Sequence, residues 1–236
     1  MIDLDDLFRE ETRVANEANE VAAQTALSAE AYRETLQRLN RHYQRLMRET
    51  WRLISRSDRA ERELNRVNEQ LNRLASELEY KATHDPLTAI WNRSAIIHRI
   101  TQTLQNGPAA LIILDIDHFK KINDDHGHPV GDKVICELVS RIQKNLPDFA
   151  SIGRVGGEEF TILLPDLFMA DAVKVAGTIH ASLNAAPLAS LPGRLVTASL
   201  GVSWGKQGSD FETLYSTADA ALYDAKHHGR NRVFFR

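Results

Sequence analysis

The chain has 236 residues, of which 43% are apolar, and its formal net charge is −3 at pH 7. That length is enough for one ordinary domain with an appendage, or for two small domains. The slightly acidic balance argues against a general nucleic-acid-binding protein, which usually carries a strong basic excess.

The cysteine content and the hydropathy pattern give an expectation about location. The single cysteine, Cys136, cannot form an intramolecular disulfide and is typical of a reducing compartment. No apolar run approaches the roughly 20 residues that span a bilayer, and the acidic first residues do not resemble a signal peptide. We therefore expect a cytoplasmic protein without a membrane span.

Glycine and proline divide the chain into two regions. Residues 1–85 contain neither, and the first of each are Pro86 and Gly107. The first region consists mainly of strong helix formers such as Ala, Leu, Glu, Arg and Gln. We therefore predict a helical stalk over residues 1–80 and a second domain over residues 81–236. The acidic first thirty residues are expected to form a separate helix that folds back or receives a partner.

A seven-residue rhythm begins at Leu36. Its two columns are apolar except at Thr50 and Ser57, and their spacing alternates between three and four residues, which is the coiled-coil pattern. The first column holds Leu36, Tyr43, Thr50, Ser57, Leu64, Leu71 and Leu78, and the second holds Leu39, Leu46, Leu53, Ala60, Val67 and Leu74. One helix cannot bury this stripe alone, so the pattern predicts a parallel homodimer. The alternative is a stripe that packs against another helix of the same chain.

The outer side of this helix carries a second pattern. Arginine recurs at every seventh residue from Arg38 to Arg73, a column that includes Arg45 and Arg52, and Trp51 lies on the same side. A solvated outer face explains arginines, but it does not explain an exposed tryptophan. Trp and Arg together are typical anchors of protein interfaces. We therefore expect a regulatory protein to bind the stalk near Trp51, Arg52 and Arg45.

The second region mixes helical and strand patterns. Helices are expected over residues 88–105, 131–145, 169–186 and 211–228, and strands over residues 109–116, 151–155, 160–164 and 195–204. Two of these strands form a hairpin around 154-RVGGEEF-160. The order predicts an α+β sheet with helices on its faces rather than a doubly wound fold.

Carboxylates gather at the ends of two of these strands. Asp115 and Asp117 lie two residues apart and so point to the same face, while Glu158 and Glu159 follow a glycine pair at the hairpin turn. If the strands are neighbours, three or four carboxylates converge. Hard divalent cations such as Mg²⁺ prefer oxygen ligands and would relieve this repulsion. Such a site supports in-line phosphoryl transfer.

Possible phosphate and base ligands surround this acidic cluster. The segment Phe119–Lys121 is expected as a short turn whose backbone N–H groups and lysine cradle phosphates, and Lys226 and Arg230 lie four residues apart at a helix end. The alternatives are a solvated turn and a helix cap, respectively. Asn123 and Asp132 have the groups to read a guanine edge. His118, His126 and His128 share a loop, but no cysteine or second histidine cluster completes a convincing zinc site.

Taken together, residues 80–236 resemble the GGDEF family of diguanylate cyclases, which condense two GTP into cyclic di-GMP. The resemblance rests on 84-HDPLTAIWNR-93, 115-DIDHFKKINDDHGHPVGD-132, the signature 154-RVGGEEF-160, 199-SLGVS-203 and 218-ADAALYDAKHHGRNRV-233. It implies a palm-like α+β fold, with a central, mostly antiparallel sheet flanked by helices. The chain as a whole resembles a short member of the family with a coiled-coil stalk.

The resemblance also implies roles for individual residues. Asp115, the carbonyl of Ile116, Glu158 and Glu159 would bind two Mg²⁺ ions per active site, with Mn²⁺ as an alternative ion. Glu158 would also act as the general base near the attacking 3′-hydroxyl. The GTP ligands implied for the base are Asn123, His128 and Asp132, and those for the triphosphate are Phe119, Lys120, Lys226 and Arg230. Each 3′-hydroxyl attacks the other GTP, so two domains must face each other.

One departure from the family pattern concerns feedback inhibition. Many members carry a product-binding Arg-x-x-Asp just upstream of the signature, whereas this chain has Pro147 and Ala150 at those positions. We therefore expect weak or no product inhibition through that site. Three alternatives stay open: a catalytically silent receptor for cyclic di-GMP or GTP, a cyclase with another nucleotide preference, and a scaffold whose coiled coil is its main function.

Overall fold

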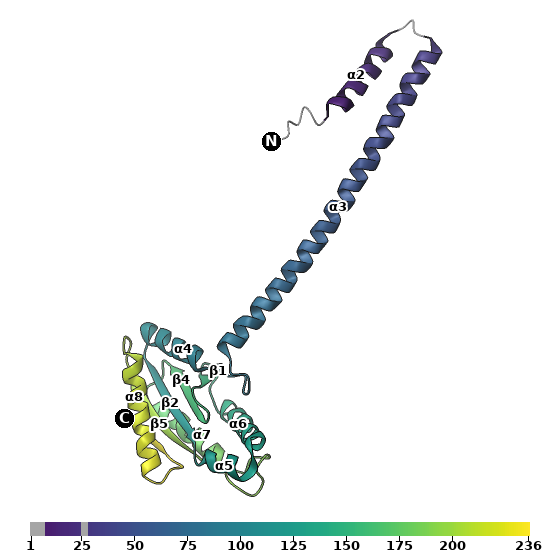
Figure 1. Ribbon diagram of the computed structural model, residues 1–236. Helices are drawn as coiled ribbons and strands as arrows, with labels where there is room; N and C mark the ends of the chain where they lie inside the picture. Colours follow the sequence, from purple (N-terminus) through teal and green to yellow (C-terminus); the bar gives the residue numbers. More distant parts are fainter. Residues whose placement is uncertain (1–7, 25–27) are drawn as a thin grey trace. The chain divides into compact units, whose positions relative to one another are not determined.

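The computed structural model describes residues 8–24 and 28–236. The chain divides into two compact units, of which one ends at Leu74 and the other spans Ala75–Arg236. The boundary expected at residue 80 falls within α3 (Ala29–Thr83), the helix that links the two units (Figure 1). In the described part of the chain, no helix combines the length and the apolarity that crossing a bilayer requires.

A short helix precedes α3 and lies against it. This helix, α2 (Arg9–Ala23), confirms the separate helix expected in the first thirty residues, of which residues 1–7 lie outside the described part. Glu17 forms an ion pair with Arg38 of α3, and Glu11 Oε1 lies 3.7 Å from His42 Nε2. Val14 is the buried residue of α2. Acidic side chains of α2 thus meet basic side chains of α3.

Most of the apolar stripe of α3 is left uncovered. No described residue of this helix is buried, and Leu36, Leu53 and Leu64 are 67%, 66% and 61% exposed. The alternative in which another helix of the same chain buries the whole stripe is therefore wrong. Because exposing this much apolar surface to water is unfavourable, the stripe is suited to an interface with another chain.

Six strands form one sheet in the order β1-β3-β4-β2-β5-β6. They are β1 (Trp91–Asn92), β2 (Ala109–Ile116), β3 (Ser151–Arg154), β4 (Glu159–Pro165), β5 (Ala198–Gly205) and β6 (Val233–Phe235). The pairs β3–β4, β4–β2 and β2–β5 are antiparallel, whereas β1–β3 and β5–β6 at the edges are parallel. The expectation of a mostly antiparallel sheet is confirmed.

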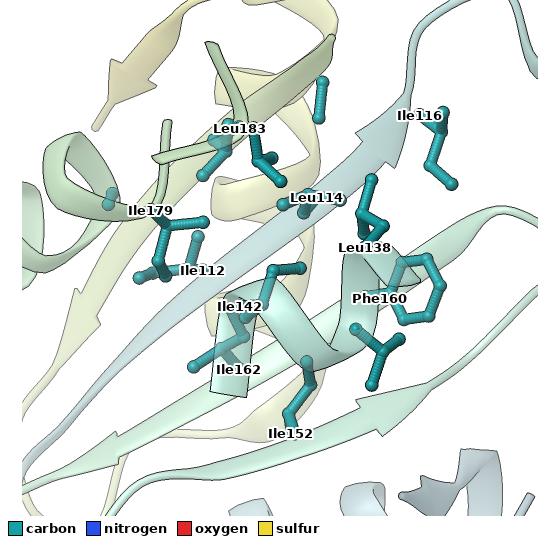
Figure 2. Packing of buried hydrophobic residues seen from close by; sticks show 14 of the residues in the cluster. Ile112, Leu114, Ile116, Leu138, Ile142, Ile152, Phe160, Ile162, Ile179 and Leu183 are labelled. Atoms are coloured by element: carbon teal, nitrogen blue, oxygen red, sulfur yellow. The ribbon is translucent and has the colours of Figure 1, made fainter. Parts of the chain in front are cut away.

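Helices cover both faces of the sheet (Figure 1). They are α4 (Arg93–Asn106), α5 (Phe119–His126), α6 (His128–Gln143), α7 (Met169–Asn184) and α8 (Phe211–His227). Successive side chains of β2 point to opposite faces. Ile112, Leu114 and Ile116 pack among residues of α6 and α7, as Figure 2 shows. Leu111 and Ile113 pack with residues of α4 and α8, so Asp115 faces the side of the sheet that carries α4 and α8.

A glycine allows α8 to lie close to β5. A Cβ atom added at Gly201 would lie 2.2 Å from the carbonyl oxygen of Ala218 and 2.4 Å from the backbone nitrogen of Leu222. Both atoms belong to the helix backbone, so no rotamer change would relieve the clash. This close approach sets the height of α8 above the sheet and brings its last turn to the end of β2.

Three expectations about local structure need correction. Helix α4 begins at Arg93 rather than at Thr88, because the side chain of Asn92 caps it by accepting a hydrogen bond from the Ala95 N–H at 3.0 Å. The segment expected as a short turn at Phe119 is the eight-residue helix α5. Helix α6 begins at His128 instead of Gly131, with a proline in its first turn, where the missing N–H has no cost.

Candidate active site

The structure brings two of the expected metal ligands together at one end of the sheet. Asp115 of β2 lies directly opposite Glu159 of β4 in the antiparallel register. Asp115 is only 6% exposed, whereas Glu159 is exposed. The N–H of Ile116 donates to the carbonyl oxygen of Glu158 at 3.2 Å, which fixes the hairpin turn against the end of β2. The sequence interpretation of these strands as neighbours is confirmed.

The glycines of the signature give the turn its tight geometry. A Cβ atom added at Gly156 would lie 2.7 Å from Oε2 of Glu159, so this carboxylate folds closely over the glycine. Gly157 is exposed and has open space beside it. A substituent at Gly156 would therefore displace Glu159, whereas Gly157 leaves room for a ligand to approach the backbone.

Burial and neighbouring charges at this end of the sheet raise the pKa of two carboxyl groups. Lys226 Nζ lies 2.9 Å from Asp115 Oδ2, and the pair is largely shielded from solvent. Burial raises the pKa of Asp115, and the hydrogen bond and charge of Lys226 oppose that rise only in part. The pKa of Glu158 is also raised, first by burial and then by the negative charge of Asp115. Glu158 is therefore a better proton acceptor than an ordinary surface glutamate.

The residues expected to bind metal offer donor atoms of the right type, but in this structure their side chains are not arranged around a common point. Carboxylate oxygens of Asp115, Glu158 and Glu159 and the backbone carbonyl of Ile116 are the hard oxygen donors that Mg²⁺ prefers. Within the described residues, however, no three acidic, histidine or cysteine side chains converge closely enough to hold a metal ion. Asp115, Glu158 and Glu159 still lie near one another, since the charges of Asp115 and Glu159 both act on Glu158, while Asp115 Oδ2 contacts Lys226.

Asp117 has a different role from the one its spacing suggested. Its carboxylate accepts hydrogen bonds from Thr197 Oγ1 at 2.8 Å, Ser199 Oγ at 2.7 Å and the Asn231 N–H at 3.0 Å. The side chain is 5% exposed. Three neutral donors satisfy this buried charge, so Asp117 joins β2, the start of β5 and the segment after α8. We identify it as a structural residue of the site.

An ion pair that the sequence did not reveal holds the signature turn from the other side. Arg154 Nη1 lies 3.2 Å from Asp85 Oδ1, and both side chains are 16% exposed. The same guanidinium donates to the carbonyl oxygen of Gly157 at 2.7 Å through Nη2. Burial alone would raise the pKa of Asp85, but hydrogen bonds from Thr88 and the charge of Arg154 lower it overall. The loop that follows α3 is thereby tied to the turn.

The expected guanine ligands lie near one another on α5 and α6. A Cβ atom added at Gly131 would lie only 1.9 Å from Asn123 Oδ1, so Asn123 packs onto the residue next to Asp132. Asn123 Oδ1 is buried and has no hydrogen-bond partner. Buried acceptors are normally satisfied, so this unpartnered oxygen is an exception that a ligand donor would relieve if Asn123 turned outward. Asp132 and His128 are exposed on the first turns of α6.

The expected phosphate ligands differ in what they present. The side chain of Phe119 is buried in the core, which leaves only its backbone available at the start of α5, while Lys120 is exposed. Lys226 faces Asp115. Arg230 is exposed, and its charge opposes the rise in the pKa of Asp115, so it lies near the same end of the sheet. Lys226, Arg230 and the carboxylates are thus brought together.

The segment expected to lack the product-binding motif forms a simple turn. The Ala150 N–H donates to the carbonyl oxygen of Pro147 at 2.9 Å, between α6 and β3. Neither side chain has a charge with which to bind an anion. The regulatory candidates Trp51, Arg52 and Arg45 lie in the other unit, where all three are exposed and Trp51 is 72% exposed.

Comparison with known proteins shows the family to which the chain belongs. Residues 82–232 match the family described as diguanylate cyclase, GGDEF domain. The chain belongs to this family. It is 39% identical over 163 residues to the probable diguanylate cyclase DgcT of Escherichia coli, a match that covers 66% of this chain and 36% of DgcT. The chain therefore spans little more than a third of that relative.

Two solved structures extend the similarity into the stalk. Diguanylate cyclase SiaD of Pseudomonas aeruginosa, solved in complex with its activator SiaC, is 30% identical, with a TM-score of 0.63 over 99% of this chain and 86% of that chain. The coiled coil and GGDEF domain of DgcB from Caulobacter crescentus, in complex with c-di-GMP, is 29% identical, with a TM-score of 0.67 over 75% of this chain and 98% of that chain. The expected resemblance to a short cyclase with a coiled-coil stalk is confirmed.

Proposed function

We propose that this protein is an active diguanylate cyclase that condenses two GTP into cyclic di-GMP and releases two pyrophosphates. The observation that carries the proposal is the intact signature turn, in which Glu159 lies opposite Asp115, and Asp115 in turn contacts Lys226. A catalytically silent receptor has no need to preserve both the acidic pair and its cationic neighbour. Family membership supports the same reaction.

Glu158 is proposed as the general base. Its pKa is raised by burial and by Asp115, which increases its affinity for the proton of an attacking 3′-hydroxyl. Asp115, the Ile116 carbonyl, Glu158 and Glu159 would hold two Mg²⁺ ions, or Mn²⁺ in their place. When bound, these ions supply positive charge that offsets the negative charge of the triphosphate. The adjacent glutamates thus divide two tasks at one turn.

The remaining ligands are proposed to orient GTP. Asn123 offers an unpartnered acceptor, and Asp132 on the neighbouring helix accepts from guanine N–H groups, with His128 beside them. Lys226 and Arg230 would bind the triphosphate, together with Lys120 and the backbone N–H of Phe119. Direct charge-assisted hydrogen bonds of this kind are stronger than neutral ones.

Dimerisation is proposed to be required for turnover. Each domain binds one GTP, and each 3′-hydroxyl must reach the α-phosphate of the other, so the reaction depends on holding two domains face to face. The exposed stripe of α3 is suited to pair two stalks and raise the effective concentration of the domains. The stalk thereby controls how often productive encounters form.

We also propose that a regulatory protein binds the stalk. SiaD, which is similar over nearly the whole chain, was solved with its activator SiaC. In this chain the exposed Trp51 and the neighbouring Arg52 and Arg45 offer an aromatic and basic surface. Replacing Trp51 and Arg52 with alanine should abolish capture of one specific protein from a lysate, and unchanged capture would contradict this assignment.

The proposed reaction is tested with purified protein, GTP and Mg²⁺, with chromatography to detect cyclic di-GMP. We expect product from the wild type and none from Glu158→Gln, whereas Glu212→Gln, a change at an exposed position in the first turn of α8, should behave as the wild type. Binding of GTP or cyclic di-GMP without turnover, with and without cell extract, would instead support the receptor.

The role of the stalk is tested in the full-length chain. Replacing Leu64 and Leu71, which are 61% and 57% exposed, with asparagine should weaken the dimer in sedimentation and lower activity most at low protein concentration. Arg59→Gln, on the outer column, serves as the control. Equal activity of the double variant and the wild type at all concentrations would refute the proposed role.

A further inference from the structure

The segment that carries Arg230 has an unusual backbone. Directly after α8, Gly229, Arg230 and Asn231 have φ angles of +107°, +60° and +45°. Residues other than glycine rarely adopt this left-handed region, and they stay there only where the surroundings hold them. The direction in which Arg230 points therefore depends on contacts that fix this turn.

Those contacts converge on Asn231. Its N–H donates to Asp117 Oδ2 at 3.0 Å, which anchors the turn to the end of β2. Its side chain exchanges two hydrogen bonds with Asn184, at 2.9 and 3.1 Å. Its carbonyl oxygen and its Oδ1 both lie 2.9 Å from Nε2 of His180. The backbone and side-chain polar groups of Asn231 are thus all engaged.

The geometry also defines the donor on His180. Both Asn231 atoms near Nε2 are acceptors, so Nε2 carries the hydrogen and donates to them. Asn184 Nδ2 lies 3.2 Å from the same ring nitrogen but donates to Asn231 Oδ1 and to the His180 carbonyl oxygen, each at 2.9 Å. His180 and Asn184 lie one helical turn apart on α7, and both form hydrogen bonds with Asn231.

We propose that His180 is a positioning residue for GTP binding, which acts through Asn231 to hold Arg230 toward the triphosphate. His180 and Asn184 belong to α7, which follows the signature turn in the sequence. Neither residue is part of the motifs that define the site. The proposal rests on the proposed function, because it needs Arg230 to bind phosphate. The proposal gives a role to the polar cluster of His180, Asn184 and Asn231, which takes no direct part in the proposed reaction.

The mechanism is one of pre-organisation. While His180 and Asn184 hold Asn231, the turn is fixed before GTP binds, so the guanidinium of Arg230 does not have to be ordered at the moment of binding. Without it, Arg230 is free to leave the left-handed conformation, and ordering it again lowers the affinity for GTP. A purely structural role for His180 would instead change stability without a specific dependence on Arg230.

The test is a double-mutant cycle in the full-length protein. Wild type, His180→Ala, Arg230→Ala and the double variant are compared by the Kd of a non-hydrolysable GTP analogue with Mg²⁺, measured by calorimetry, and by KM and kcat at one protein concentration. We expect His180→Ala to raise Kd and KM roughly tenfold, in the range of coupling between contacting residues, with kcat less affected. In the Arg230→Ala background the same change should have no further effect.

Conservative and control variants distinguish positioning from general damage. His180→Gln keeps an N–H donor near the position of Nε2 and should restore most of the affinity. Asn184→Ala should resemble His180→Ala, and it serves as the second variant if His180→Ala unfolds. His98→Ala, at an exposed position on α4, is the matched control and should bind as the wild type.

The possible outcomes distinguish the positioning role of His180 from the proposed cyclase function. Equal losses from His180→Ala with and without Arg230, or no loss at all, would overturn the positioning role, and so would an unchanged Kd for Arg230→Ala. A wild-type protein that binds the analogue with the full coupling but forms no cyclic di-GMP from GTP would refute the proposed function and leave the positioning role intact.

Discussion

The ion pair between Asp85 and Arg154 offers a direct test of how the signature turn is held. Asp85→Asn removes the negative charge but keeps an acceptor for Thr88, whose N–H and hydroxyl donate to Asp85 Oδ1 at 3.0 and 2.6 Å. The variant therefore isolates the electrostatic part of the contact. Arg154 would keep its hydrogen bonds to the Gly157 carbonyl but lose the partner that orients it.

The magnitude follows from the exposure of the pair. Breaking an exposed ion pair costs about 0–1 kcal/mol, whereas removing one partner of a fully buried pair costs about 3–5 kcal/mol. At 16% exposure for both side chains, the pair lies between these limits. We expect Asp85→Asn to lower the free energy of unfolding by about 2 kcal/mol, or Tm by roughly 4–8 °C for a domain of this size.

The effect should depend on pH with a definite sign. The pKa of Asp85 is lowered in the folded protein, so its charge contributes stability above the pKa of the unfolded chain. That contribution is lost as pH falls through the lowered, folded-state pKa. The Tm difference between wild type and Asp85→Asn should therefore be constant from about pH 5 to 7.5 and shrink below about pH 4, near the ordinary aspartate pKa.

The assay is thermal unfolding of the wild type, Asp85→Asn, Arg154→Gln and the double variant, with initial rates of cyclic di-GMP formation alongside. Asp171→Asn is the control, because the side chains of Asp171 and Lys174 in its ion pair are 56% and 76% exposed, and water screens such a pair so that it contributes little to stability. The rate should fall roughly tenfold or more with Asp85→Asn, since the turn loses its alignment. Additive effects of the two single variants, or a loss as large in Asp171→Asn, would refute this reasoning.

Three further predictions concern ligands. Lys226→Ala should raise KM for GTP by about tenfold or more, because a charge-assisted contact is lost, while Lys226→Arg should retain part of the affinity; equal KM values for all three proteins would count against a phosphate role. Gly131→Ala forces Asn123 aside and should raise KM about fivefold, the worth of one hydrogen bond, whereas Gly177→Ala, where an added Cβ meets nothing within 4 Å, should leave KM unchanged. Adding cyclic di-GMP should leave the initial rate of GTP turnover unchanged, and strong inhibition would show that product binds elsewhere.

The parts of the fold that the sequence predicted are those encoded by continuous stretches. The run 109-AALIILDI-116 is buried along its whole length, and its predicted bounds coincide with those of β2. The glycine pair and the apolar segment after it predicted the hairpin that brings Glu159 to Asp115. Local patterns of this kind decide both the type of an element and its neighbours.

The parts that the sequence did not predict depend on contacts between distant residues. Arg154 and Asp85 are 69 residues apart, and Asn231 and Asp117 are 114 apart. Spacing alone placed Asp117 with Asp115 in one acidic cluster, because it showed a shared face but not the three donors that surround Asp117. No local pattern marks His180, whose partner lies 51 residues away.

The four carboxylates at this end of the sheet can coexist because their surroundings differ. The carboxylate of Asp117 accepts hydrogen bonds from three donors, and Asp115 is paired with Lys226. Glu159 is exposed, so water screens its charge. Glu158 combines partial burial with the nearby negative charges of Asp115 and Glu159, and all three raise its pKa. Repulsion between neighbouring acidic groups therefore raises the pKa of Glu158, which is the side chain that we propose as the proton acceptor.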